Sequence, residues 1–218
     1  MNRVQILVEG YTERDFVQEI LAPVLSLRQV HVTAPVIGKP GHKGGARSWE
    51  STCPEIMAAL KHTPVVSTMF DYYAMPLDWP GRCAAQHLAM PARALTVEEE
   101  MGKAVTQVMG ESFDPRRFVP YVELHEFEAM LFSDASKLAQ TLQKPNLTDY
   151  FQGILNEFGG PEAINDGLQT APSKRILHAV PRYDKRLDGI LAASNIGLDR
   201  IRNSCPHFAQ WLTRLENL

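Results

Sequence analysis

The chain is poor in cysteine, and its few cysteines are far apart. Its 218 residues include Cys53, Cys83 and Cys205, with no C-x-x-C spacing among them. This pattern excludes a zinc ribbon and a disulfide framework, and it is typical of a reducing compartment. We therefore expect a cytoplasmic protein that is stabilised by an apolar core, and a chain of this length can bury a substantial one.

Long apolar runs are also missing. No window approaches the roughly 20 apolar residues of a membrane-spanning helix, and the N-terminus lacks the basic and apolar regions of a signal peptide. We expect no membrane partner. The chain also contains no Walker motif, because the glycine-rich loop at residues 38–47 does not end in G-K-[ST]. Lys39, Lys43 and Arg47 in this loop are weak candidates for phosphate contacts, and a plain surface loop is the alternative.

The first part of the sequence alternates short apolar runs with helix-like segments. Strands separated by connections of helix length favour a parallel sheet with helices on both faces, so we predict an α/β fold. Two Thr-x-x-acid spacings, Thr12 with Asp15 and Thr96 with Glu99, resemble capping boxes at helix starts. The predicted strands are residues 4–8, 30–37, 65–70 and 118–124, and the predicted helices are residues 12–25, about 54–61 and 96–109.

The pattern changes near residue 134. Strand-like runs disappear, and short helical segments are interrupted by proline and glycine. No Ser/Gly-rich spacer separates this part from the rest. The sequence therefore predicts an α/β core at residues 1–133 and a helical C-terminal lobe at residues 134–218 that packs on the core.

Carboxylates follow two of the predicted strands directly. Glu9 follows the run at residues 4–8, Glu13 comes four residues later, and Asp71 ends the run at residues 65–70. A charge at the end of a buried strand must be paired, solvated in a cleft or bound to a cation. Because the ends of parallel strands meet at one sheet edge, these acids suggest a divalent-metal site. For Glu13 the alternative is an interaction with the dipole of its own helix.

A third acidic cluster follows the predicted strand at residues 118–124. It starts at Glu123, the last acid of that run, and His125, Glu126 and Glu128 come directly after the predicted strand end. If these side chains lie at the same edge as Glu9 and Asp71, they complete a Mg²⁺ or Mn²⁺ site with carboxylate and water ligands. The alternative is an acidic helix start that is stabilised by the helix dipole.

Charge is unevenly distributed along the chain. Residues 97–134 contain nine acids and three bases, a balance of −6, whereas residues 171–202 contain seven bases and three acids, a balance of +4. Lys174, Arg175, Lys185 and Arg186 in the basic segment are candidates for contacts with a nucleic-acid backbone. They could equally pair with the acidic cluster inside the protein, and charge runs are often merely solvated faces.

Four short motifs give the chain a family resemblance. They are V-E-G-Y-T-E at residues 8–13, F-D-Y-Y-A-M-P at 70–76, H-E-F-E-A-M-L-F at 125–132 and A-P-S-K-R at 171–175. In this order they resemble an uncharacterised family of bacterial Toprim-like proteins, related to the Toprim domain of overcoming-lysogenization-defect nucleases. The resemblance to that family spans nearly the whole chain, and the resemblance to Toprim proper covers about the first 130 residues.

The resemblance implies a magnesium-dependent nuclease or related phosphodiester-processing enzyme. It implies nucleic acid as the partner, DNA above all, and an ATPase of the ABC/SMC type in a bacterial defence or DNA-processing system. The expected catalytic residues are Glu9, Glu13, Asp71, His125 and Lys174, and the expected metal ligands are Glu9, Asp71, Glu126 and Glu128.

One position departs from the Toprim pattern. The Toprim aspartate pair reads D-x-D, and Tyr73 stands here in the place of the second aspartate. Either Glu126 or Glu128 supplies the missing carboxylate, or the site binds metal weakly. In the second case the protein is a catalytically silent module that binds nucleic acid or a partner ATPase.

Overall fold

The fold is described from a computed structural model that covers residues 2–39, 42–43, 47–164 and 170–218. The chain divides into two compact units. Unit 1 comprises residues 1–124 and 211–218, and unit 2 comprises residues 125–210. The sequence placed the boundary at residues 133 and 134 and assigned the whole C-terminus to the second part. In the structure the H-E-F-E-A-M-L-F segment belongs to unit 2, and the end of the chain belongs to unit 1.

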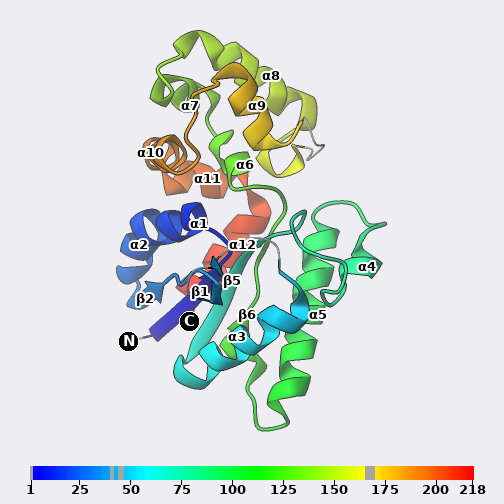
Figure 1. Ribbon diagram of the computed structural model, residues 1–218. Helices are drawn as coiled ribbons and strands as arrows, with labels where there is room; N and C mark the ends of the chain where they lie inside the picture. The colour runs from blue at the N-terminus through cyan, green and yellow to red at the C-terminus, as the bar shows by residue number, and fades with distance from the viewer. Residues whose placement is uncertain (1, 40–41, 44–46, 165–169) are drawn as a thin grey trace. The chain divides into compact units, whose positions relative to one another are not determined.

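Unit 1 is built on a parallel sheet, as the alternation of apolar runs predicted (Figure 1). The strand order is β2-β1-β5-β6, and β7 continues along the same side of β5. All four pairings are parallel. The strands are β1 (Asn2–Val8), β2 (Val30–Thr33), β5 (Val65–Asp71), β6 (Phe118–Val119) and β7 (Val122–Glu123). A separate antiparallel pair joins β3 (Gly38–Lys39) to β4 (His42–Lys43).

Helices cover both faces of the sheet (Figure 1). On one face, α3 (Trp49–His62) and α5 (Ala92–Met109) bury Ile56 and Val97 in a core with Val66 and Phe70 of β5. Ser67 points to the opposite face, because side chains alternate along a strand. There its hydroxyl accepts a hydrogen bond from Nε1 of Trp211 (2.9 Å), a residue of α12 (Pro206–Glu216). The remaining helices of unit 1 are α1 (Tyr11–Phe16), which runs through a π-helical turn (Val17–Leu21) into α2 (Ala22–Ser26), and α4 (Arg82–Ala85).

Proline interrupts the predicted strand at residues 118–124. Pro120 lies between β6 and β7 and has no N–H to donate to the ladder. Thr68 of β5 compensates for this break with its side chain, because its Oγ1 accepts from the N–H of Tyr121 (3.0 Å) and donates to the carbonyl of Tyr121 (2.9 Å). The predicted strand at residues 30–37 is likewise interrupted, and after Pro35 only a bridge between Val36 and Val8 continues the pairing.

The described residues of unit 2 form helices joined by turns and short connections, with no strand among them. Its longest helix that lies wholly inside the unit is α8 (Thr148–Phe158), whose buried face carries Phe151 and Ile154. The buried rings of Phe132 and Phe151 pack edge to face, with ring centroids 5.7 Å apart. The helices are α6 (Glu128–Leu131), α7 (Ala135–Thr141), α8 (Thr148–Phe158), α9 (Pro172–Ala179), α10 (Leu187–Ile196) and α11 (Leu198–Ser204), and α12 starts in this unit.

No helix in the described part of the chain is both long and apolar enough to cross a membrane.

Candidate functional site: an acidic sheet edge in unit 1

Three neighbouring strands of the sheet end in carboxylates. Glu9 follows the end of β1, Asp71 is the last residue of β5, and Glu123 is the last residue of β7. Because β5 pairs with both other strands in parallel, the three ends meet at the carboxyl edge of the sheet. We call Glu9, Asp71 and Glu123 the acidic edge.

Strand register brings these residues to neighbouring positions. Asp71 and Glu123 are direct register partners, so their side chains leave the same face of the sheet. Val8, which precedes Glu9, pairs with Met69, two residues before Asp71. Adjacent strands lie about 4.8 Å apart. β1 and β5 therefore end side by side, and a site shared by Glu9 and Asp71 stays a prediction.

Gly10 brings Glu13 close to the backbone at the end of β1. The Oε2 atom of Glu13 lies 2.5 Å from the position that a Cβ on residue 10 would occupy. A side chain at this position would displace the carboxylate. Gly10 is also the N-cap residue of α1, which has no side-chain capping bond. The capping box predicted for Thr12 and Asp15 is therefore wrong.

Asp15 has a different partner. Its Oδ1 accepts hydrogen bonds from Nε (2.8 Å) and Nη2 (2.6 Å) of Arg14. The Arg14 guanidinium also lies 4.7 Å from the ring centroid of Tyr11, an exposed aromatic two residues after Glu9. These contacts fix the first turn of α1 next to the acidic edge.

Asp71 is oriented by the turn that follows it. Its Oδ1 accepts a hydrogen bond from the backbone N–H of Tyr73 (2.8 Å), which closes an Asx turn at the end of β5. Asp71 and Tyr73 are both half-buried. An asparagine at this position could accept the same hydrogen bond but carries no charge. The variant Asp71→Asn therefore keeps the turn and removes only the charge.

Glu123 is the member of the edge that the sequence placed in the third acidic cluster but did not assign as a metal ligand. Its side chain is buried in the structure, with an exposure of 4%. The signal was present, because an acid at the end of an apolar run is the same feature that identified Asp71. Because the predicted strand extended to Leu124, Glu123 lay inside it and was not recognised as an acid at a strand end.

The His125, Glu126 and Glu128 cluster belongs to unit 2 and has partners there. Glu126 Oε2 accepts from the N–H of Ser173 (3.0 Å) at the start of α9, so two of the four motifs meet in one contact. His125 is buried, and its Nε2 lies 3.1 Å from the carbonyl oxygen of Glu162. Glu128 is completely buried and forms an ion pair with Lys185 (3.0 Å).

Burial dominates the protonation of Glu128. Loss of solvation raises the pKa of its carboxyl to about 7, although the charge of Lys185 acts in the opposite direction. The same burial raises the pKa of Tyr183, whose hydroxyl is 3.4 Å from Glu128 Oε1. These contacts give Glu126 and Glu128 structural roles inside unit 2, in addition to the metal role expected of them.

The structure gives contacts for three of the predicted basic residues and shows that two others are exposed. Arg175 donates to the Thr170 carbonyl (2.7 Å), Lys185 pairs with Glu128, and Arg47 pairs with Glu55. Lys174 and Arg186 are exposed. The side chains of Lys39 and Lys43 lie outside the described part of the structure.

Carboxylates in proteins bind divalent cations in two common ways. Among the described residues, no group of three or more His, Cys, Asp or Glu side chains stands in an arrangement that could hold a metal ion. Mg²⁺ commonly binds in another way, through one or two carboxylates together with waters and substrate phosphates. Half-buried Glu9 and Asp71, on adjacent strand ends, fit that second mode.

Comparison with protein families gives one match. The model of DUF4276, a domain of unknown function, covers residues 8–216. The chain belongs to this family. The match spans both units and includes all four motifs of the sequence. Comparison with curated proteins and with solved structures gave no significant match.

Proposed function

We propose that this DUF4276 member is a divalent-metal-dependent phosphodiester hydrolase that acts on nucleic acid at the acidic edge. The observation that supports this proposal is the arrangement of β1, β5 and β7, three adjacent parallel strands whose ends carry Glu9, Asp71 and Glu123. Partly buried carboxylates at the ends of adjacent strands are costly unless they are protonated, paired or offset by a cation. The resemblance of the V-E-G-Y-T-E segment to Toprim proteins agrees with Mg²⁺ as that cation.

In this proposal Glu9 and Asp71 hold the metal, and Glu123 is the buried acid on the strand next to Asp71. When bound, Mg²⁺ would neutralise the phosphate charge and align the scissile bond. Asp71 is held in a fixed orientation by the Tyr73 N–H, so little orientational freedom is lost on binding. Glu13, beside Gly10, is the candidate to accept a proton from the attacking water.

The proposal also covers the substrate, the partner protein and the cellular compartment. We take DNA as the favoured substrate and an ABC/SMC-type ATPase as the partner, both from the family resemblance. The cysteines Cys53, Cys83 and Cys205 are free thiols. Free thiols agree with activity in the cytoplasm, where thiols stay reduced.

The proposal is tested with charge-removing variants of near-identical shape. Glu9→Gln and Asp71→Asn should each abolish cleavage of a panel of single-stranded DNA, duplex DNA and RNA in Mg²⁺ or Mn²⁺. Glu111→Gln is the matched control, because Glu111 is an exposed carboxylate of unit 1 after the end of α5. The melting temperature of the two edge variants in chelator should stay level or rise, because each removes repulsion between carboxylates.

A different outcome would identify the alternative function. If the wild-type chain binds nucleic acid equally well in chelator and cleaves no member of the panel, the protein is a metal-independent binding module. A fall in the melting temperature of both edge variants without metal would instead show that these acids are structural partners.

A further inference from the structure

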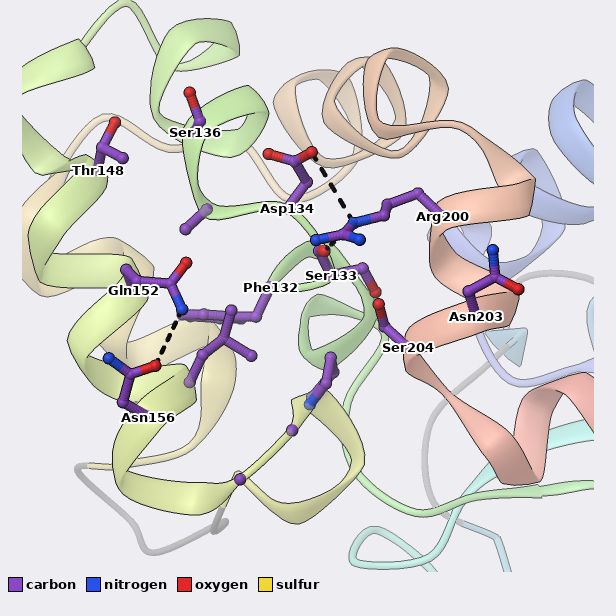
Figure 2. Close-up of a pocket in the computed structure, with 15 residues that line it drawn as sticks. Phe132, Ser133, Asp134, Ser136, Thr148, Gln152, Asn156, Arg200, Asn203 and Ser204 are labelled. Atoms are coloured by element: carbon purple, nitrogen blue, oxygen red, sulfur yellow. Dashed lines mark hydrogen bonds and ion pairs between the residues drawn. The ribbon is translucent and has the colours of Figure 1, made fainter.

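Unit 2 contains a cavity of about 690 Å³ that has no part in the chemistry proposed for unit 1. It lies between α8 and α11, and the segment at residues 132–136 forms its floor (Figure 2). The volume is in the range of sites for small molecules and cofactors, about 300–1,000 Å³. All residues that line it belong to unit 2.

The wall formed by α8 presents amide groups. Gln152 and Asn156 are four residues apart and lie on one face of the helix, where Nε2 of Gln152 donates to Oδ1 of Asn156 (3.0 Å). This bond leaves the second oxygen of the pair, Oε1 of Gln152, and the second amide nitrogen, Nδ2 of Asn156, with no hydrogen-bond partner among the described residues. Reversing both amides gives the same result. The wall therefore offers one acceptor, on Gln152, and one donor, on Asn156, which are the kinds of hydrogen-bonding group that a nucleobase also carries.

The opposite wall presents a guanidinium group. Nε of Arg200 donates to the carbonyl of Ser133 (2.9 Å) and lies 4.0 Å from Oδ2 of Asp134. The side chain is 58% exposed, and its terminal Nη1 and Nη2 groups contact no acceptor in the part of the chain that the structure describes. A guanidinium fixed at Nε with both terminal nitrogens open is suited to bidentate binding of a phosphate. Asn203 and Ser204 follow on the same face of α11 and add neutral polar groups (Figure 2).

The charge balance limits the ligand to one with few negative charges. Oδ1 of Asp134 accepts from the N–H of Lys137 (3.0 Å) as the N-cap of α7, so its carboxylate is a fixed part of the floor. Arg200 and Asp134 are the only charged residues that line this cavity of unit 2 in its described residues. A polyphosphate would meet one cation and one anion. A ligand with a single phosphate and a larger neutral, hydrogen-bonding body fits this balance better.

We propose that this cavity binds a nucleoside monophosphate unit, with the phosphate on Arg200 and the base edge on Gln152 and Asn156. The unit could be a free mononucleotide or the 5′-phosphorylated end of a strand, since both present the same groups. The inference is independent of the proposed function, because the site uses unit 2 residues alone and needs no metal.

The experiment is a calorimetric titration of the full chain in chelator. The probes are AMP, GMP, CMP and UMP, the corresponding nucleosides, inorganic phosphate, and a 5′-phosphorylated tetranucleotide with its unphosphorylated counterpart. At least one monophosphate should bind more tightly than its nucleoside and than inorganic phosphate. Preferential binding of the phosphorylated tetranucleotide over all mononucleotides would identify a strand end as the ligand, and the reverse order would identify a free nucleotide.

Variants separate this site from general electrostatic attraction. Arg200→Gln should weaken binding about tenfold or more, because it removes charge-assisted hydrogen bonds. Arg202→Gln removes the same charge from the same helix at a position that does not line the cavity, and should bind like wild type. Asn203→Ala serves as a second site variant, since Asn203 is exposed and its removal should leave the melting temperature unchanged while weakening binding.

Two results would overturn the proposal. One is the failure of every monophosphate and of the phosphorylated tetranucleotide to bind at millimolar concentration. The other is equal weakening by Arg200→Gln and Arg202→Gln together with no effect of Asn203→Ala. Loss of nuclease activity in Glu9→Gln with unchanged nucleotide binding would leave this inference intact, so the two proposals fail separately.

Discussion

At the scale of single residues, the two sets of acids that the sequence grouped together have different surroundings. Glu9 and Asp71 are half-buried at strand ends, whereas Glu128 is fully buried beside Lys185. An acid at the end of an apolar run is visible in the sequence. The ion pair of Glu128 is not, because it joins residues 57 positions apart whose contact depends on helix packing.

The raised pKa of Glu128 predicts a pH-dependent stability. The folded state holds the proton up to about pH 7 and an unfolded glutamate releases it near 4.5, so the free energy of unfolding should fall as pH rises between these values. The full effect is about 3 kcal/mol at most. Glu128→Gln should flatten this slope and be more stable than wild type at pH 8, measured by denaturant unfolding beside Glu111→Gln. A variant less stable than wild type at pH 8 would show that the attraction of Lys185 outweighs the cost of burial.

Gly10 gives a residue-scale test of Glu13. Gly10 has an extended backbone that any residue can adopt, and a Cβ there would meet only the end of the Glu13 side chain. Gly10→Ala should therefore fold with a melting temperature close to that of wild type while displacing the Glu13 carboxylate. If Glu13 accepts a proton in the reaction, turnover should fall strongly, with Gly153→Ala on the exposed side of α8 as the control. Full activity of Gly10→Ala would remove Glu13 from the mechanism.

At the scale of elements, the strands were easier to predict than the helix starts. The run at residues 65–70 became β5 almost residue for residue. The capping-box signal at Thr96 was wrong, since α5 begins at Ala92. The extra turn buries Ala94 completely in the core with Val97, and packing of that kind commonly outweighs a local capping preference. For α3 the sequence placed the start near Pro54, but the helix begins at Trp49.

A missed local signal explains the start of α3. Ser48 is its N-cap, and Ser48 Oγ accepts from the N–H of Ser51 (3.3 Å). Serine at this position is a common helix start. Pro54 lies inside the second turn of α3. Because proline is common in the first turn of a helix, the sequence suggested that the helix starts there.

Glu162 gives a prediction for the start of α12. Its two carboxylate oxygens accept from the N–H groups of His207 (3.0 Å) and Phe208 (2.9 Å), which are helix-start donors that no intrahelical carbonyl can satisfy. Glu162→Ala should lower the free energy of unfolding by about 1–3 kcal/mol, because it leaves buried donors unpaired. Glu162→Gln keeps one acceptor and should lose clearly less. Equal losses in the two variants, measured by denaturant unfolding, would contradict this role.

At the scale of the whole molecule, the sequence predicted one acidic and one basic region. In the structure the residues of the basic region do not act alike, because some of them contact other parts of the chain. Arg175 and Lys185 have internal partners, whereas Lys174 and Arg186 are exposed. The division into two units was also only approximate in the sequence, because the return of residues 211–218 to unit 1 depends on the stacking of Trp211 on Tyr121 (4.3 Å between ring centroids). A contact between residues so distant in sequence leaves no local pattern.

This division predicts different effects for the four basic residues. Lys174→Ala and Arg186→Ala should weaken nucleic-acid binding similarly across sequences, and each should reduce the salt slope by about 0.9 if its side chain neutralises one phosphate. The melting temperature of Lys174→Ala should stay at the wild-type value. Arg175→Ala and Lys185→Ala should lower the melting temperature instead. A salt slope identical to wild type in both exposed variants, measured by fluorescence anisotropy, would exclude these two side chains from phosphate binding.

The most direct test of the acidic edge is a Mn²⁺ titration of the full chain, followed by the electron paramagnetic resonance signal of free Mn²⁺. The wild-type chain and Glu111→Gln should bind the ion with the same affinity, and a short phosphorothioate oligonucleotide should strengthen binding, because substrate phosphate completes the coordination. Glu9→Gln and Asp71→Asn should each weaken binding about tenfold or more, the loss of one charged ligand. Equal Mn²⁺ affinity in wild type and both edge variants would contradict the assignment of Glu9 and Asp71 as metal ligands.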